Sequence, residues 1–273
     1  MKFLAKTLLI LISIPLIIIC MLSVNIKFQF LSSGFWIKSF ESGNVYSKVS
    51  SIVEDRLIER VEAEGGMKSD IKVLSDLISP QSLKTVFERN IESILLYANG
   101  KTPEMSVFVP LALSDALEGR DYYNLDNFSE KMTFAEFLEK FNIDSVKSSD
   151  IEVVSKFGTQ STILIITSFG ILVLVFVLMY LATNSGKRFI APAIALSLSG
   201  LVILGASFGT DYMNRMLVRD LTDSANMGAS LVAAFAPPVI QNLMDIWIWF
   251  GASALILGIA AFFVRKPKTA ENK

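Results

Sequence analysis

Four long runs of apolar residues constrain this chain more than any other feature. They cover Leu4–Val24, Thr162–Thr183, Ile190–Phe208 and Ile246–Val264, and Lys6 is the one charged residue among them. A helix of roughly 20 apolar residues crosses a bilayer core of about 30 Å. The runs do not alternate between apolar and polar residues as barrel strands do. They therefore predict four membrane-spanning helices.

The first run is expected to stay in the protein as a signal anchor over residues 1–24. Its apolar stretch, Thr7–Val24, is longer than the stretch of about 7–15 residues in a cleaved signal peptide. No A-x-A cleavage site follows it.

The distribution of charge predicts the orientation of the spans. Lys and Arg collect on the cytoplasmic side of membrane proteins. The N-terminus, the turn between the second and third spans, and the tail 265–273 together carry eight basic residues and one acidic residue. Segment 25–161 carries 15 basic and 21 acidic residues, and segment 209–245 carries two and four. Both termini are expected in the cytoplasm and both long segments outside, in the plasma (inner) membrane.

These boundaries predict a mainly α protein. We expect a bundle of four transmembrane helices (4–24, 162–183, 190–208 and 246–264) with a mostly helical extracytoplasmic domain, 25–161, between the first two. Segment 209–245 is expected to be an extracytoplasmic amphipathic loop, a short helical pair that Pro237-Pro238 interrupts before the fourth span. It forms either a structural lid on the outer domain or a membrane-active element.

Five helices are expected in the outer domain, and three of them have a start or stop signal in the sequence. Apolar residues at helical spacing cover 44–64, where Gly65-Gly66 end the helix. Ser79-Pro80 have the pattern of an N-cap and first helical residue, so a second helix is expected over 80–98. Thr133-x-x-Glu136 is a capping box for a third helix over 134–141. Shorter helices are expected near 71–78 and 114–118.

One extended segment is also expected in this domain. Met105, Val107 and Val109 alternate with other residues, and Pro103 and Pro110 flank them. Because proline is confined to edges within sheets, this pattern favours an edge strand.

Aromatic residues are concentrated near the predicted membrane surfaces. Such residues anchor spans at the level of the headgroups, and a hydrophobic groove for a partner or lipid is the alternative. The candidate anchors are Phe35, Trp36, Phe40, Trp247 and Trp249.

Small residues recur along the last two spans and predict close helix packing. The third span has small residues every four positions, and the fourth has them at intervals of three and four. We expect the two stripes to pack against each other. They are Ala191, Ala195 and Ser199, and Gly251, Ala254, Gly258 and Ala261.

The sequence contains little from which a catalytic or metal site is built. It has no histidine and one cysteine, so a Ser-His-Asp triad or a His-based metal site is excluded. No phosphate-binding loop, dinucleotide fingerprint or nucleophile elbow occurs. A Ser–Lys dyad and a paired-carboxylate site remain the chemical alternatives. We expect a non-enzyme without catalytic residues, cofactor or metal.

Part of the outer domain resembles a broad set of uncharacterised bacterial multi-span membrane proteins. The resemblance covers about residues 30–115 and implies no activity. The residues that carry it are Phe35-Trp36, Asn44-Val45-Tyr46, Ser79-Pro80, Leu83, Glu88-Arg89, Ile91-Glu92, Tyr97–Lys101 and Val107–Leu111.

These features together predict a binding or assembly module that acts through residues 25–161. Its partners are expected to be the lipid bilayer and either another envelope protein or a second copy of this chain. Nucleic acid is not expected as a partner, because the outer domain carries a net negative charge and would repel the negatively charged phosphates. The alternatives are a transport or channel component and a membrane-embedded ligand sensor.

Overall fold

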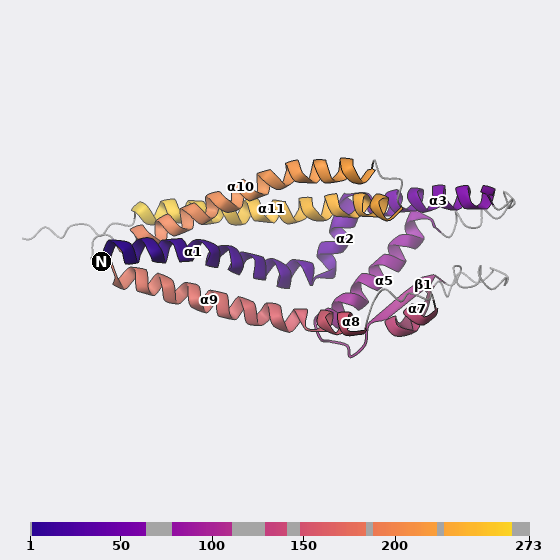
Figure 1. Ribbon diagram of the computed structural model, residues 1–273, viewed down its shortest axis with the longest axis horizontal. Helices are drawn as coiled ribbons and strands as arrows, with labels where there is room; N and C mark the ends of the chain where they lie inside the picture. The colour runs from indigo at the N-terminus through magenta and orange to yellow at the C-terminus, as the bar shows by residue number, and fades with distance from the viewer. Residues whose placement is uncertain are drawn as a thin grey trace, which may run out of the picture. The chain divides into compact units, whose positions relative to one another are not determined.

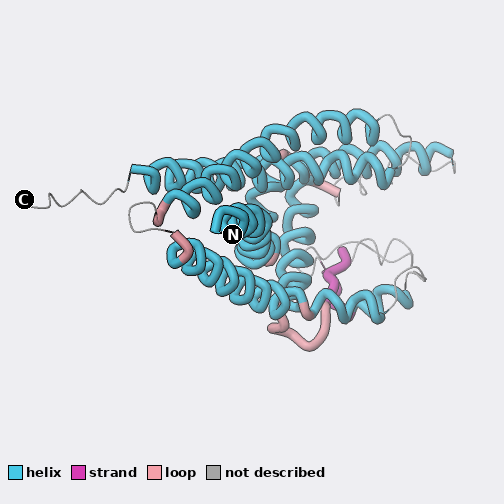
Figure 2. The backbone as a smooth tube through the Cα atoms, turned by 60° about the vertical axis from the view of Figure 1, so that its left-hand side comes forward, coloured by secondary structure: helices cyan, strands magenta, loops and turns pink. Residues whose placement is uncertain are grey.

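The computed structural model describes residues 2–63, 78–110, 129–140, 148–183, 188–222 and 227–263. These residues are almost entirely helical, and one short pair of strands interrupts the pattern (Figures 1 and 2). They fall into two compact units. Unit 1 contains residues 1–26, 161–215 and 240–273, and unit 2 contains residues 27–160 and 216–239.

The elements follow one another in a simple order. Helix α1 precedes a short π-helix and the helices of unit 2, and α9, α10 and α11 close the described chain. The bounds are α1 Lys2–Asn25, a π-helix Ile26–Phe30, α2 Ser33–Ser42, α3 Val45–Ala63, α5 Pro80–Ala98, β1 Ser106–Pro110, β2 Ser129–Thr133, α7 Phe134–Lys140, α8 Ser148–Ser155, α9 Phe157–Leu181, α10 Ile190–Thr222 and α11 Met227–Phe263.

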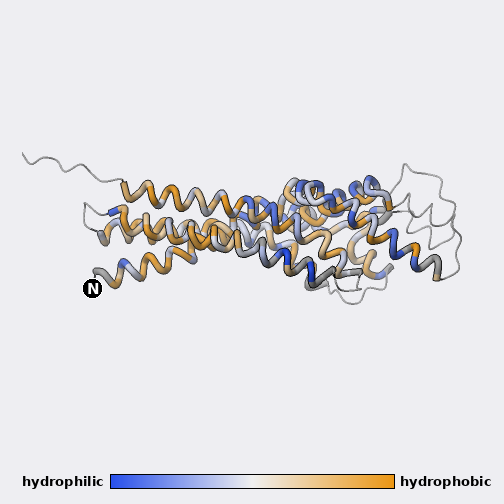
Figure 3. The backbone as a smooth tube through the Cα atoms, turned by 90° about the horizontal axis from the view of Figure 1, so that it is seen from above, coloured by the Kyte–Doolittle hydropathy of each residue, from blue (hydrophilic) through white to orange (hydrophobic). Residues whose placement is uncertain are grey.

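Four of these helices are long and apolar enough to cross a membrane, which confirms the predicted number of spans. The qualifying stretches are Leu4–Phe30, Phe157–Leu181, Ile190–Met216 and Gly228–Phe263. Figure 3 shows them coloured mainly as hydrophobic where they form unit 1. Large apolar side chains such as Leu4 (74% exposed) point outward, as expected where the surrounding medium is lipid.

Within unit 1, α10 and α11 lie side by side at very short range (Figure 1). A methyl group at Gly200 would lie 2.7 Å from the Gly251 carbonyl oxygen and 2.7 Å from the Leu255 nitrogen. One at Gly258 would lie 2.7 Å from the Ser197 nitrogen. The two backbones therefore approach to a distance that only glycine permits.

The face of α10 that contacts α11 is not the predicted stripe. Ala191 and Ala195 pack instead against Val175 and Met179 of α9, with Leu9 and other α1 side chains beside them. At about 100° per residue, the α11-facing position 193 lies roughly 200° around the helix from 191. Spans three and four therefore pack against each other as predicted, and Gly251 and Gly258 of α11 lie at the contact. On α10, however, the contact is made by the face of Ser197 and Gly200 and not by the Ala191–Ser199 stripe.

Unit 2 contains more chain than the segment 25–161 expected from the sequence. Residues 216–239 of α10 and α11 belong to the same compact unit as 27–160. Its central core consists of Phe40, Val45, Tyr46, Val49 and Ala234, which are all at most 6% exposed. Around it lie Trp36, Ile52, Val53, Leu83, Phe87, Ile91, Leu231, Phe235 and Val239.

Aromatic contacts connect the distant parts of this core. The Phe40 and Phe235 rings lie 5.2 Å apart between centroids, and Phe87 and Phe235 lie 5.7 Å apart in a T-shaped arrangement. Tyr46 stacks on Phe87 at 6.2 Å. Offset and T-shaped pairs of this kind add stability beyond burial alone. They join α2, α3 and α5 to the first half of α11.

Pro237-Pro238 do not interrupt the chain, contrary to the sequence prediction, because α11 is continuous from Met227 to Phe263. Each proline removes one helical N–H donor, so this stretch of helix depends on packing. Leu231, Ala234, Phe235 and Val239 supply that packing. The Pro238 ring also occupies the space beside Gly43, where any side chain would overlap it. The described parts of segment 209–245 thus belong to the two long helices α10 and α11 and do not form a separate helical pair.

Several local predictions in unit 2 are confirmed. Helix α5 has the predicted bounds, and the Ser79 side chain accepts a hydrogen bond from the Ser82 nitrogen at its N-terminus. The capping box is present, with Thr133 N donating to Glu136 Oε2 (2.7 Å) and Glu136 N donating to Thr133 Oγ1 (3.2 Å). The expected termination at Gly65-Gly66 and the helix near 114–118 lie outside the described residues, as does the helix near 71–78 except for Ile78.

The predicted edge strand is β1, and its partner strand was not predicted. Strand β2 pairs with it antiparallel, with Ser106 opposite Thr133 and Phe108 opposite Lys131. Helix α7 follows β2 directly.

Candidate functional site

Helix α5 holds the strand pair through side-chain bonds to the outer edge of β1. Asn90 Nδ2 donates to the Phe108 carbonyl oxygen, and Phe108 N donates to Asn90 Oδ1, both at 2.9 Å. One helical turn further on, Ser93 Oγ donates to the Ser106 carbonyl oxygen (2.7 Å) and accepts from Ser106 N (3.2 Å). Two polar side chains thus take the place of a third strand. They fix the rotation of α5 and satisfy an edge that would otherwise be unpaired.

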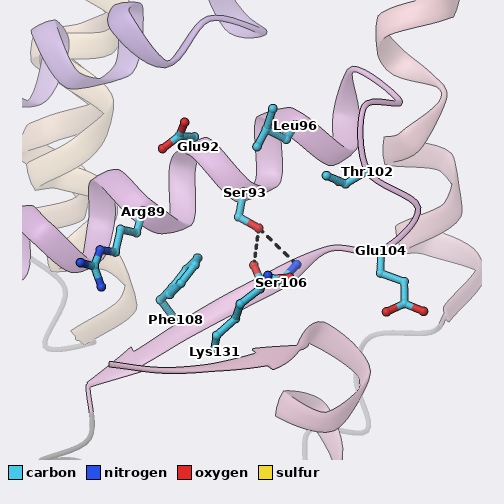
Figure 4. A pocket seen from close by; sticks show the side chains of 9 residues that line it. All are labelled: Arg89, Glu92, Ser93, Leu96, Thr102, Glu104, Ser106, Phe108 and Lys131. Atoms are coloured by element: carbon cyan, nitrogen blue, oxygen red, sulfur yellow. Dashed lines mark hydrogen bonds between the residues drawn. The ribbon is translucent and has the colours of Figure 1, made fainter. Parts of the chain in front are cut away.

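A hollow of about 160 Å³, here called the α5–β hollow, lies along this contact. Figure 4 shows Arg89 and Phe108 at one end and Thr102 and Glu104 at the other. The Arg89 guanidinium lies 5.9 Å from the centre of the Phe108 ring, within the range of a cation–π interaction. The complete lining is Arg89, Glu92, Ser93, Leu96, Thr102, Glu104, Ser106, Phe108 and Lys131.

A second hollow, here called the α2–α5 hollow, shares two lining residues of α5 with the first. Its volume is about 300 Å³, and Arg89 and Glu92 line it as well as the first hollow. The other lining residues are Ser33, Ile37, Thr85 and Glu88. Both shared side chains are exposed. This pair of opposite charges, which both hollows share, is here called the Arg89–Glu92 ridge.

An ion pair of Lys84 and the buried phenol of Tyr46 lie next to the N-terminal half of α5. Lys84 Nζ donates to Glu41 Oε1 at 2.6 Å, and this bond to a carboxylate raises the pKa of Lys84. Burial, with the negative charges of Glu88 and Glu41 adding to it, raises the pKa of Tyr46 to about 12. Tyr46 Oη has no hydrogen-bond partner among the described residues. The phenol is therefore held neutral in the core.

The predicted anchor residues occupy different environments. Phe40 is 6% exposed and lies in the unit 2 core, and Trp36 packs against that core while its Nε1 donates to the Phe30 carbonyl oxygen (2.8 Å). Phe35 contacts Trp36 at 5.8 Å between centroids. In unit 1, Trp249 is 75% exposed, and its surface is available to the medium around the helices. Trp247 is partly buried.

The predicted packing residues of α11 lie on or beside the α10 contact. Gly251 and Gly258 are buried against α10, whereas Ala254 and Ala261 are half-buried. The α10 residues opposite them, Ala193, Ser197, Gly200 and Leu204, were not singled out from the sequence. A repeat of four identifies one small face, but it does not identify which neighbour that face contacts.

The residues of the two hollows were also not predicted as a site. Asn90 and Ser93 are three apart and so share one face of a helix, which is a signal available from the sequence. Their bonds to β1 depend on a tertiary contact that no spacing reveals. In the described ranges, no three Asp, Glu, Cys or His side chains are grouped in a way that could hold a metal ion.

Comparisons with protein-family models, curated proteins and solved structures find no match to this chain.

Proposed function

We propose that this chain is a non-enzymatic docking module of the plasma (inner) membrane. Unit 2 lies on the extracytoplasmic side and binds another envelope protein, and unit 1 anchors it. The excess of Lys and Arg in the short segments supports this orientation.

The composition of unit 2 supports placing both long segments on one side of the membrane. Residues 216–239 share a core with residues 27–160. Two candidate spans, Phe157–Leu181 and Ile190–Met216, separate these segments in the chain. An even number of crossings returns the chain to its starting side, so the packing and the four-span topology agree.

The observation that carries the docking function is the Arg89–Glu92 ridge on a fixed scaffold. Arg89 and Glu92 are exposed, while Asn90 and Ser93 lock the same helix to β1. A preorganised face binds at lower entropic cost than a mobile one, and arginine is enriched among residues that dominate interface energies. The adjacent hollows provide depressions for side chains of the partner.

Three buried hydroxyl groups of the spans argue for anchoring and against a transport pathway. Ser13, Ser199 and Ser207 donate to the carbonyl oxygens of Leu9, Ala195 and Ile203, each four residues earlier, at 2.7–2.8 Å. A hydroxyl bonded to its own helix is not offered to a permeating solute. Flux measurements in proteoliposomes test this: solute or ion flux above that of empty vesicles would favour the transport alternative.

Site-specific crosslinking in native membranes tests the docking proposal. A photo-crosslinking amino acid replaces Glu92 in the full-length chain, and in a matched control it replaces Lys48, which is exposed on α3 away from both hollows. We expect a reproducible protein adduct at position 92 that is absent at position 48. Arg89→Glu in the same background should reduce the adduct. No adduct at 92, or the same adducts at both positions, would contradict the proposal.

A further inference from the structure

The α5–β hollow contains charges of both signs at separate places. Arg89 lies at one end and Glu104 at the other (Figure 4), with Glu92 on the α5 side and Lys131 contributed by β2. No ion pair of Lys131, Glu92 or Glu104 is present within the described ranges. Arg89 has five N–H donors, enough for more than one acceptor. This arrangement is complementary to a ligand that carries an anionic and a cationic group some distance apart.

The length of the hollow sets the size of the ligand. Arg89 and Leu96 are seven residues apart on α5, which corresponds to about 10 Å at 1.5 Å per residue. An extended peptide covers about 3.3–3.6 Å per residue, so roughly three residues match this length. Phe108 and Leu96 supply apolar surface for the peptide side chains.

The wall also determines the mode of recognition. The backbone groups of Ser106 and Phe108 on the α5 side of β1 are already bonded to Ser93 and Asn90. A peptide in this hollow therefore cannot add to β1 as a strand. The site can instead recognise the charged ends of the peptide, its ammonium and its carboxylate.

We propose that the α5–β hollow binds a free peptide of two or three residues, with its carboxylate at Arg89 and its ammonium at Glu104. This inference does not rest on the docking function. Because Arg89 and this hollow also belong to the proposed docking surface, the peptide and the protein partner would compete for them.

Calorimetric titration of the full-length protein in detergent tests the proposal. The probe is Ala-Leu-Ala, used with free ends, N-acetylated, C-amidated, and blocked at both ends. We expect binding of the free peptide and a loss of about fivefold in affinity on blocking either end, the upper range for exposed ion pairs. No binding of the free peptide at about 10 mM, or equal affinity for the doubly blocked form, would overturn the proposal.

Variants connect each peptide end to its residue. Glu104→Gln should weaken the free peptide about fivefold but leave the N-acetylated form unchanged, because that form has no ammonium to lose. Arg89→Gln should weaken the free peptide and leave the amidated form unchanged. Lys48→Gln on α3 is the matched control and should bind as the original chain does. Equal losses for blocked and free peptides in the Glu104 and Arg89 variants would show a general structural effect and contradict the assignment.

Discussion

Single side chains determine how unit 2 presents its surface. Asn90 and Ser93 each make a donated and an accepted hydrogen bond to one residue of β1, and so they replace a strand with two short side chains. Arg89 and Glu92 precede them on α5 and remain exposed. Exposed charged residues and residues that hold α5 against β1 thus alternate along this part of the helix. This separation lets the surface residues change without loss of the scaffold.

Tyr46 gives a pH-dependent prediction at the residue scale. The pKa of its phenol is about 12 in the folded protein and 10.0 for an ordinary tyrosine, so the folded chain keeps a proton that the unfolded chain releases. The stability contributed by neutral Tyr46 is complete below pH 10 and is lost as the pH rises toward 12. We expect Tyr46→Phe to remove the part of the stability loss at alkaline pH that comes from this phenol. It should be neutral or stabilising at pH 7, because Tyr46 Oη has no partner in the described part of the chain.

Thermal unfolding followed by circular dichroism between pH 7 and 12 checks this prediction. Tyr97→Phe is a suitable control, since it removes a phenol that is also buried but lies outside the central core of unit 2. A Tyr46→Phe protein whose melting temperature falls with pH in parallel with the original chain would contradict the account.

At the scale of the elements, glycine sets the distance between α10 and α11. We expect Gly200→Ala to destabilise unit 1 by about 1–3 kcal/mol, because the added methyl meets backbone atoms of α11 that cannot rotate away. Gly205 lies on the same helix with open space where a side chain would be. Gly205→Ala should therefore be neutral or stabilise by up to about 1 kcal/mol.

Chemical or thermal unfolding of both glycine variants in the same detergent measures the difference. If Gly200→Ala and Gly205→Ala have equal stability, the close approach of the two backbones is not what holds this pair of helices.

The elements also show what the sequence can and cannot specify. Helix α5 was predicted to its terminal residues because Ser79, Pro80 and the Asn99-Gly100 pair are local signals. Strand β2 was missed because Ser129–Thr133 contain one large apolar residue, Met132, and become a strand by pairing with β1. The prediction that Pro237-Pro238 interrupt the chain was wrong because the packing that keeps α11 helical comes from residues of α2, α3 and α5, which are distant in the sequence.

The candidate site, like β2, depends on tertiary contacts and could not be predicted from the sequence. Its lining comes from α5, the segment after it, β1 and β2. None of these residues forms a motif by itself. Charge and polarity on α5 are visible in the sequence, whereas the partner surface that converts them into a hollow depends on the tertiary fold.

At the scale of the whole molecule, unit 2 is assembled from segments that two spans separate in the sequence. We expect Phe235→Ala to destabilise unit 2 by about 2 kcal/mol or more, because the ring contacts both Phe40 and Phe87. Hydrogen exchange should rise in α2 and α5 as well as in α11. Val232→Ala, on an exposed position of the same helix, is the matched control. Faster exchange confined to α11 would show that the segments do not share a core.

We propose that both long segments lie outside the membrane and form one binding unit. Single cysteines at Ser69, Ser185 and Ser224 test it most directly in intact cells with a membrane-impermeant thiol reagent, since the native Cys20 lies within the first span. The account predicts labelling at positions 69 and 224, and labelling at 185 only after the membrane is opened. Labelling of 185 in intact cells, or opposite behaviour of 69 and 224, would contradict it.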